Sequence, residues 1–96
     1  MPEFRLSPAA QNDLEGIFEY TVERWGLDQA IRYIEALEKT CTALAESPDT
    51  AQDCDHIRPG YLRSPVGRHF IYFRAEDFGI AVIRILHQHM DQSRHL

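Results

Sequence analysis

Histidines and arginines in the last third of the chain are the residues best suited to chemistry. His87 and His89 follow an apolar run, and imidazole titrates near neutrality. Such a histidine can act as general acid or base, provided that cations stabilise the charge that develops on the reacting group. Arg63, Arg68 and Arg84 could supply those cations. The alternative interpretation is that His87 is an ordinary polar group at a strand end.

Two looser groups of residues could in principle bind a metal. The first is His87, His89 and His95, and the second is Cys54-Asp55-His56. Neither has the paired spacing of a zinc site, so we expect no metal, and nothing else in the sequence points to a cofactor.

Cys41 falls on the apolar face of a predicted helix, which favours a small core residue over a nucleophile.

Tyr20 and Trp25 stand at helical spacing and have two interpretations. Their rings could form a platform on which a nucleotide base stacks. The apolar residues of this helix follow one another in steps of three and four, which line one face, and this favours positions in the core and at its rim for the two rings. We therefore expect Trp25, like Leu37 in the following helix, to lie in the core.

Arg84 interrupts an otherwise apolar strand, and a charge there needs a partner. One interpretation is an ion pair with a helix carboxylate or with Asp77. The other is a contact with a second protein. The sequence leaves both open.

Length and charge restrict the function further. Ninety-six residues suffice for one small domain, 1–96, and the net charge of −5 argues against broad binding to nucleic acid. Lys39 is the only lysine. The first residues lack the apolar segment of a signal peptide, and no apolar run is long enough to span a bilayer. Two cysteines are too few for a disulfide scaffold and indicate a reducing compartment. We therefore expect a cytoplasmic protein with no membrane partner.

The first half of the chain reads as a strand and two helices. Residues 3–6 alternate polar and apolar, and Ser7-Pro8 is a typical helix start, with Ser7 as N-cap. Gly26 ends this helix, and Asp28 can cap the next. Ser47-Pro48 ends the second helix. So short a link predicts an antiparallel helical hairpin. The apolar face of the second helix comprises Ala30 or Leu27, Ile31, Ile34, Leu37, Cys41, Leu44 and Ala45.

The second half reads as a loop and three strands. Residues 49–59 form the loop, 60–64 a strand and 64–67 a turn. Residues 69–74 and 80–90 then form a hairpin. Alternation along the last strand predicts two faces: Ala81, Ile83, Ile85, His87 and His89 on one, and Ile80, Val82, Arg84, Leu86, Gln88 and Met90 on the other.

The predicted order is therefore β-α-α-β-β-β, a two-layer α+β fold. Four strands make a sheet about 15–20 Å wide, and two helices about 8–10 Å apart cover that width once. The last two strands nevertheless carry apolar residues on both faces. Either the loop 49–59 or a partner must cover the second face, since a large exposed apolar patch marks an interaction site.

Assembled in this way, the sequence resembles the ParE branch of the RelE/ParE toxin superfamily of type II toxin–antitoxin systems. The most specific matching segments are Leu6-Ser7-Pro8-Ala9-Ala10-Gln11-Asn12-Asp13-Leu14 and the closing Leu86-His87-Gln88-His89-Met90-Asp91. Weaker matches include Trp25-Gly26 and Leu44-Ala45-Glu46-Ser47-Pro48, so the similarity covers nearly the whole chain. The family commonly has arginine where this chain has His89.

The resemblance implies a helical hairpin packed on one face of a mainly antiparallel sheet. It also implies a toxin that inhibits DNA gyrase by binding and is neutralised by a ParD-like, ribbon-helix-helix antitoxin, through which alone it would reach DNA. The alternatives are a ribosome-dependent mRNA endoribonuclease of the RelE type, with His87 as its catalytic residue, and a non-toxic relative that only binds antitoxin. The expected antitoxin contacts are Tyr72, Val82, Arg84 and Leu86. The expected target contacts are Arg63, Arg68, Arg84, His87, His89, Met90 and Arg94.

Overall fold

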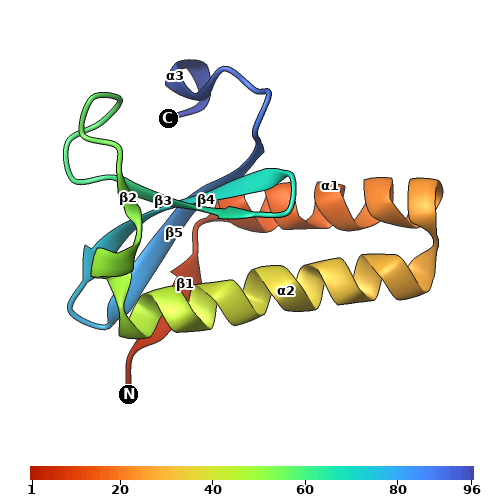
Figure 1. Ribbon diagram of the computed structural model, residues 1–96, viewed down its shortest axis with the longest axis horizontal. Coiled ribbons are helices and arrows are strands. Elements are labelled where there is room, and N and C mark those ends of the chain that lie inside the picture. The colour runs from red at the N-terminus through yellow and green to blue at the C-terminus, as the bar shows by residue number, and fades with distance from the viewer.

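The computed structural model, which describes residues 1–96, places two long helices against a five-stranded sheet (Figure 1). The strand order is β1-β5-β4-β3-β2, with β1 parallel to β5 and every other pair antiparallel. The α+β architecture with a helical hairpin is as predicted. Its elements are β1 (Glu3–Leu6), α1 (Pro8–Trp25), α2 (Leu27–Glu46), the 3-10 turn η1 (Pro48–Thr50), β2 (Gln52–Asp53), β3 (Leu62–Val66), β4 (His69–Glu76), β5 (Gly79–His87) and α3 (Gln92–His95).

Local signals position the helical hairpin. The Ser7 hydroxyl accepts the Ala10 N–H at 3.0 Å, which confirms the predicted N-cap, and it donates to the carbonyl of Ile83 at 2.7 Å. One side chain therefore caps α1 and ties it to the central strand β5. Gly26 alone separates the helices, and α2 begins at Leu27 with Gly26 as its N-cap and no side-chain cap, so the predicted cap at Asp28 is wrong.

The main core lies between the hairpin and one face of the sheet. It contains Leu37 and Cys41, as predicted, but not Trp25, whose side chain is 64% exposed. Leu27 and Ile31 are also exposed, so the predicted apolar faces are wrong near the turn between the helices. An 18-residue helix is about 27 Å long, and Figure 1 shows the hairpin extending past the sheet. Beyond that edge the small side chain of Ala30 is buried, whereas the larger side chains of Trp25, Leu27 and Ile31 stay exposed.

A β-bulge changes the faces of β5. Phe73 pairs with Val82 and Tyr72 pairs with Arg84, which leaves Ile83 as an extra residue. Strict alternation is broken there, so the two predicted sets of residues are wrong. On the helix side lie Ile80, Val82 and Ile85; on the opposite side lie Tyr72 and Leu86. The strand ends at His87, before the predicted residue 90.

The β4–β5 hairpin is confirmed, with a connection of two residues, Asp77 and Phe78. Gly79, just after that connection, lies so close to β1 that a Cβ atom there would fall 2.0 Å from the carbonyl oxygen of Glu3. Glycine is therefore required where the first and last strands meet.

The predicted turn at residues 64–67 is wrong, because β3 runs on to Val66 and the turn is Gly67-Arg68. Pro65 is tolerated within this strand since β2 pairs only with Leu62 and Arg63, which leaves residues 64–66 at the sheet edge. The predicted loop 49–59 also contains η1 and β2.

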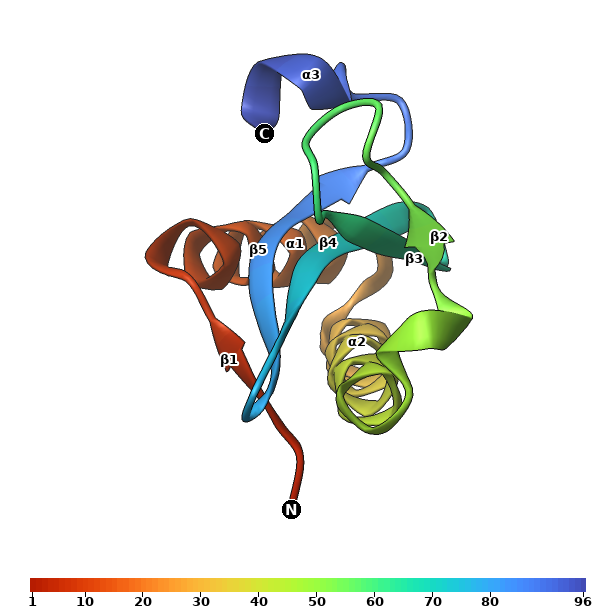
Figure 2. The ribbon, with the colours of Figure 1, turned by 90° about the vertical axis from the view of Figure 1, so that its left-hand side faces the viewer.

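The second face of the sheet is covered by the chain itself. Figure 2 shows the loop before β3, and α3, on the side of the sheet opposite α2. Cys54, Tyr72 and Leu86 form a small buried cluster there, packed by Tyr61, Phe70 and Leu96. The loop therefore does cover this face, and the last residues, for which the sequence suggested no packing role, contribute to the cover. No helix is long and apolar enough to cross a membrane.

Candidate functional site

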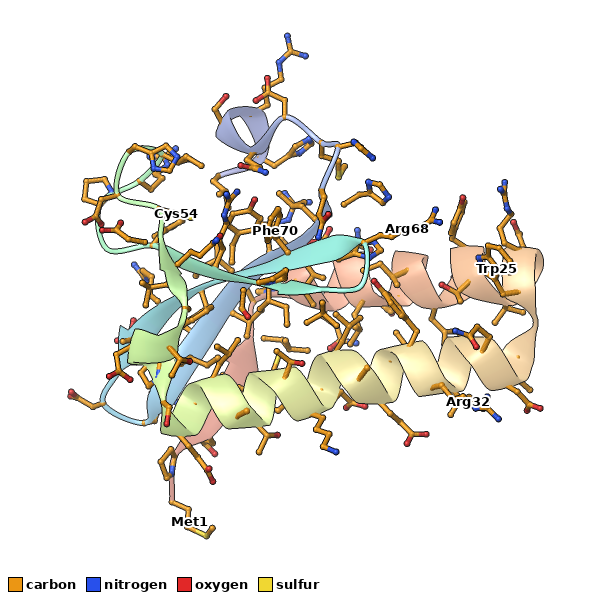
Figure 3. The ribbon with its side chains drawn as sticks, viewed as in Figure 1. Met1, Trp25, Arg32, Cys54, Arg68 and Phe70 are labelled. Atoms are coloured by element: carbon orange, nitrogen blue, oxygen red, sulfur yellow. The ribbon has the colours of Figure 1, made fainter.

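A groove of about 490 Å³ lies where the tip of the helical hairpin meets the β3–β4 turn and the end of β5. Figure 3 shows Trp25 at the end of α1 and Arg68 at the β3–β4 turn. The groove is therefore built from segments that are distant in sequence. Its lining residues are Tyr20, Thr21, Arg24, Trp25, Gln29, Tyr33, Gly67, Arg68, His69 and His87.

Tyr33 of α2 holds the β3–β4 turn in place. Its hydroxyl accepts the Arg68 N–H at 3.1 Å, donates to the Val66 carbonyl at 3.0 Å, and lies 2.7 Å from Nδ1 of His69. Gly67 has φ +55°, and a Cβ atom on it would lie 2.6 Å from the Tyr33 ring. Burial raises the pKa of the Tyr33 hydroxyl. These contacts position Arg68 at the rim of the groove.

A row of three histidine rings, those of His69, His87 and His89, begins beside Tyr33. The rings of His69 and His87 meet edge to face at 5.3 Å, and those of His87 and His89 lie 5.1 Å apart. Burial, reinforced by the neighbouring His87, lowers the pKa of His69 to about 4. His69 is therefore neutral at pH 7, and it is the site residue that the sequence reasoning missed. The signal was available, since His69 is the cross-strand partner of His87 in the hairpin.

The predicted target-binding arginines do not converge. Arg84 forms a two-point ion pair with Asp13 of α1, at 2.7 and 2.8 Å, and this hydrogen bonding raises its pKa. Arg63 stacks on Phe70, with its guanidinium 4.2 Å from the ring, and bonds to Gln92. Of the three, only Arg68 lines the groove beside His87.

The remaining predicted target contacts lie on the exposed segment after β5. His89 is exposed, Met90 is 41% exposed, and Arg94 pairs only with Asp91 of the same short helical turn. Their role in target binding stays a prediction.

The predicted antitoxin contacts are mostly inaccessible. Tyr72, Val82 and Leu86 are each at most 1% exposed, because Val82 packs under the helices and the other two lie beneath the loop and tail. Of the two alternatives for the second face of the sheet, cover by the loop is therefore the one found, and no apolar surface is left uncovered there for a partner. These side chains could contact an antitoxin only after the covering segments moved, so their role in binding stays a prediction.

Neither cysteine is built as a nucleophile. Burial raises the pKa of the Cys41 thiol to about 12 and also raises that of Cys54, which is fully buried. No group of three or more histidine, cysteine, aspartate or glutamate side chains has an arrangement that could hold a metal ion.

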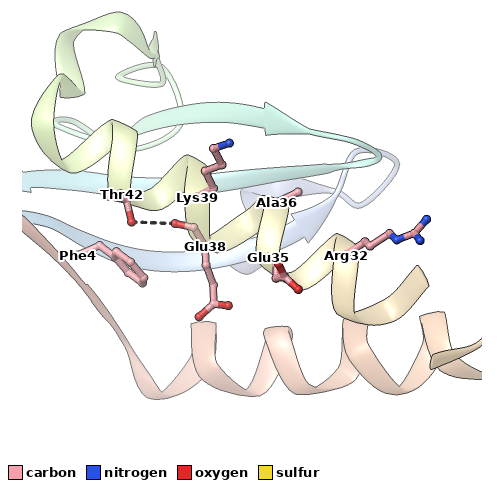
Figure 4. A pocket seen from close by; sticks show the side chains of 7 residues that line it. All are labelled: Phe4, Arg32, Glu35, Ala36, Glu38, Lys39 and Thr42. Carbon is pink, nitrogen blue, oxygen red and sulfur yellow. Dashed lines mark hydrogen bonds between the residues drawn. The ribbon is translucent and has the colours of Figure 1, made fainter. Parts of the chain in front are cut away.

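A second hollow, of about 560 Å³, lies on the outer face of α2 (Figure 4). Two basic and two acidic side chains line it at helical spacing, namely Arg32, Glu35, Glu38 and Lys39. Such a surface is a solvated helix face in which neighbouring charges offset one another, so it is a weaker candidate than the groove.

Residues 4–92 match the family described as the ParE toxin of the type II toxin–antitoxin system, parDE. The chain is 44% identical over 94 residues to Toxin ParE1 of Mycobacterium tuberculosis, covering 97% of this chain and 96% of that protein. It is 38% identical over 96 residues to Toxin ParE1 of Caulobacter vibrioides, covering 100% and 99% of the two chains.

A solved structure described as the chromosomal ParDE TA system from P. aeruginosa has the same fold. It superposes with a TM-score of 0.77 at 18% identity, covering 91% of this chain and 96% of that one. Together with the family match along residues 4–92, the fold and the relatives lead to one conclusion. The chain belongs to the ParE toxin family of type II toxin–antitoxin systems.

Proposed function

We propose that this toxin inhibits DNA gyrase by binding, without catalysis, and that a ParD-like antitoxin neutralises it. The observation that carries the proposal against RNA cleavage is the ion pair between Arg84 and Asp13. A cleavage site must present several cations to the scissile phosphate. With Arg84 neutralised and Arg63 stacked on Phe70, Arg68 is the only one of the three predicted cations that lines the groove with His87.

One observation favours the rival function, a ribosome-dependent endoribonuclease. His87 lines the groove together with Arg24 and Arg68, so a possible acid or base and two cations share one hollow. A binding inhibitor would block gyrase and leave mRNA intact, whereas a ribonuclease would cut mRNA and leave gyrase active. Separate assays of gyrase and of mRNA therefore distinguish the two functions.

The test pairs the purified protein with gyrase in a supercoiling assay and, separately, with translating ribosomes and mRNA. We expect supercoiling to be inhibited while the mRNA stays intact, and we expect addition of a ribbon-helix-helix ParD-like antitoxin to restore supercoiling. Codon-specific cuts in the mRNA with supercoiling untouched would refute the proposal and establish the ribonuclease.

A variant pair sharpens the assay. His87→Ala should lower gyrase inhibition modestly if the ring only shapes a binding surface, whereas it would abolish cleavage by an enzyme that uses it as acid or base. The matched control is His56→Ala, which removes an exposed imidazole in the loop before β3.

A further inference from the structure

Two aromatic rings at the groove are largely exposed to solvent. Tyr20 is 58% exposed and Trp25 is 64% exposed, although residues of this type usually bury most of their surface. Both line the groove. Their exposure removes the core interpretation that the sequence favoured and leaves the other, in which the rings form a stacking platform.

The groove is also positively charged within an acidic protein. The chain has 15 acidic and 10 basic residues, yet the groove lining includes Arg24 and Arg68 and not one carboxylate. Neither guanidinium takes part in an ion pair. The Arg24 guanidinium lies 5.5 Å from the Tyr20 ring. Aromatic faces and unpaired cations therefore share one hollow.

We propose that this groove binds a nucleoside phosphate, with the base stacked on Trp25 or Tyr20 and the phosphate held by Arg68 and His87. Base–aromatic stacking and arginine–phosphate hydrogen bonds are the two interactions that recognise unpaired nucleotides. The volume of about 490 Å³ falls in the range of small-molecule sites, about 300–1,000 Å³. The ligand is either a free mononucleotide or an unpaired nucleotide within single-stranded nucleic acid.

The groove fits this ligand better than it fits an acidic peptide. All of its large apolar surface is aromatic, and no leucine, isoleucine, valine or methionine side chain lines it. An amphipathic helical peptide docks its apolar side chains into a hydrophobic groove, whereas a base stacks on a flat ring face. A double helix is unfavourable because the net charge of −5 repels its many phosphates, but a single phosphate needs only the local cations. The inference goes beyond gyrase inhibition and does not depend on it.

The experiment uses the fluorescence of Trp25, the only tryptophan in the chain. A base stacked on the indole should quench its emission, so titration with AMP should give saturable quenching. Adenosine, which lacks the phosphate, and ribose 5-phosphate, which lacks the base, should each bind at least tenfold more weakly than AMP. Absence of quenching by AMP and by an unpaired oligonucleotide, or equal binding of AMP and adenosine, would overturn the proposal.

A matched pair of arginine variants tests the phosphate contact. Arg68→Gln should weaken AMP binding about tenfold, because a hydrogen bond to a charged group is lost. Arg32→Gln removes an exposed guanidinium on the outer face of α2, outside the groove (Figure 3), and should leave binding unchanged. Equal losses in both variants would show a general charge effect and refute the assigned site.

Calorimetry of Trp25→Ala tests the stacking contact. Its exposed position predicts an unchanged circular dichroism spectrum together with AMP binding weakened by about fivefold or more. Unchanged binding would overturn the platform.

Further titrations identify the source of the ligand. Tighter binding of an unpaired pentadeoxyadenylate than of AMP would show that the groove binds single-stranded nucleic acid. Tighter binding of AMP would show that it binds free mononucleotides. A preference for a hairpin duplex, or for a glutamate-rich peptide, over both would refute a nucleoside phosphate.

Discussion

Asp13 and Arg84 lie 71 residues apart in sequence and form a two-point ion pair, with N···O distances of 2.7 and 2.8 Å. The same carboxylate accepts the backbone N–H of Ile85 at 2.9 Å. Both side chains are mostly buried, with 12% and 23% of their surfaces exposed. Asp13 thus provides a hydrogen-bond acceptor for a backbone N–H of β5 just beyond Val82, the last residue of β5 that pairs with β1.

Removing this carboxylate should destabilise the fold. Asp13→Ala leaves a partly buried guanidinium and the N–H of Ile85 without their partner, so we expect a loss of about 2–3 kcal/mol, between the values for exposed and buried pairs. Urea denaturation measures it. Arg94→Gln, which breaks an exposed pair with Asp91, is the control and should change stability by less than about 1 kcal/mol. Equal effects would contradict a structural role for the Asp13–Arg84 pair.

Leu37 and Trp25 should respond differently to truncation. Leu37→Ala opens a cavity in the core and should cost about 2–5 kcal/mol, since Leu37 is 1% exposed. Trp25→Ala removes a ring that is 64% exposed and should cost less than about 1 kcal/mol. Thermal melts of the two variants make the comparison. A large loss for Trp25→Ala would show that the ring is packed in solution.

Charges placed on the sheet should unfold the protein rather than weaken a complex selectively. Leu86→Asp puts a carboxylate into the buried cluster with Cys54 and Tyr72, and should cost about 4 kcal/mol or more. Val82→Asp should do the same beneath the helices. Met90→Asp, at an exposed position, is the control. A well-folded Leu86→Asp protein that had lost only its antitoxin affinity would revive the idea of a sheet-face binding site.

Stability should fall between pH 6.5 and pH 4 because of His69. Burial lowers its folded-state pKa from 6.5 to about 4, so below pH 6.5 the unfolded chain binds a proton that the folded protein does not. This contribution is complete above pH 6.5 and is lost as the pH falls towards 4, by up to about 3 kcal/mol, a value that solvent screening of the half-buried ring reduces. Urea unfolding at a series of pH values should show a shallower decline for His69→Gln than for His56→Gln, an exposed loop histidine. Identical slopes would contradict a buried, neutral His69.

Much of the secondary structure could be predicted because its signals act over a few residues. Ser7 and Pro8 start α1 through a bond to the next turn, and Gly26 ends it. The β4–β5 hairpin follows from two apolar strands around a short polar turn. The last residues of β3 were harder, since the tolerance of Pro65 depends on where the neighbouring strand β2 ends.

The candidate site was predicted only in part. His87 and Arg68 were singled out, and both line the groove. His69 and Tyr33 were not, because their importance comes from a contact between α2 and the β3–β4 turn, 36 residues apart. Arg63 and Arg84 were expected near His87, but their partners on other elements hold them away from the groove.

By itself, the sequence determined the order of the first strand, the two long helices and the last three strands, and it carried the resemblance to ParE toxins, since periodicity, capping and turn chemistry are local. Only the tertiary structure decided which side chains face solvent. The bulge at Ile83 reverses the two faces of β5 beyond it, and the extension of the hairpin past the sheet exposes Trp25. The first depends on the register between β4 and β5, and the second on the length of the helices relative to the sheet on which they pack. Contacts between residues distant in sequence decide both, and no local pattern encodes such contacts.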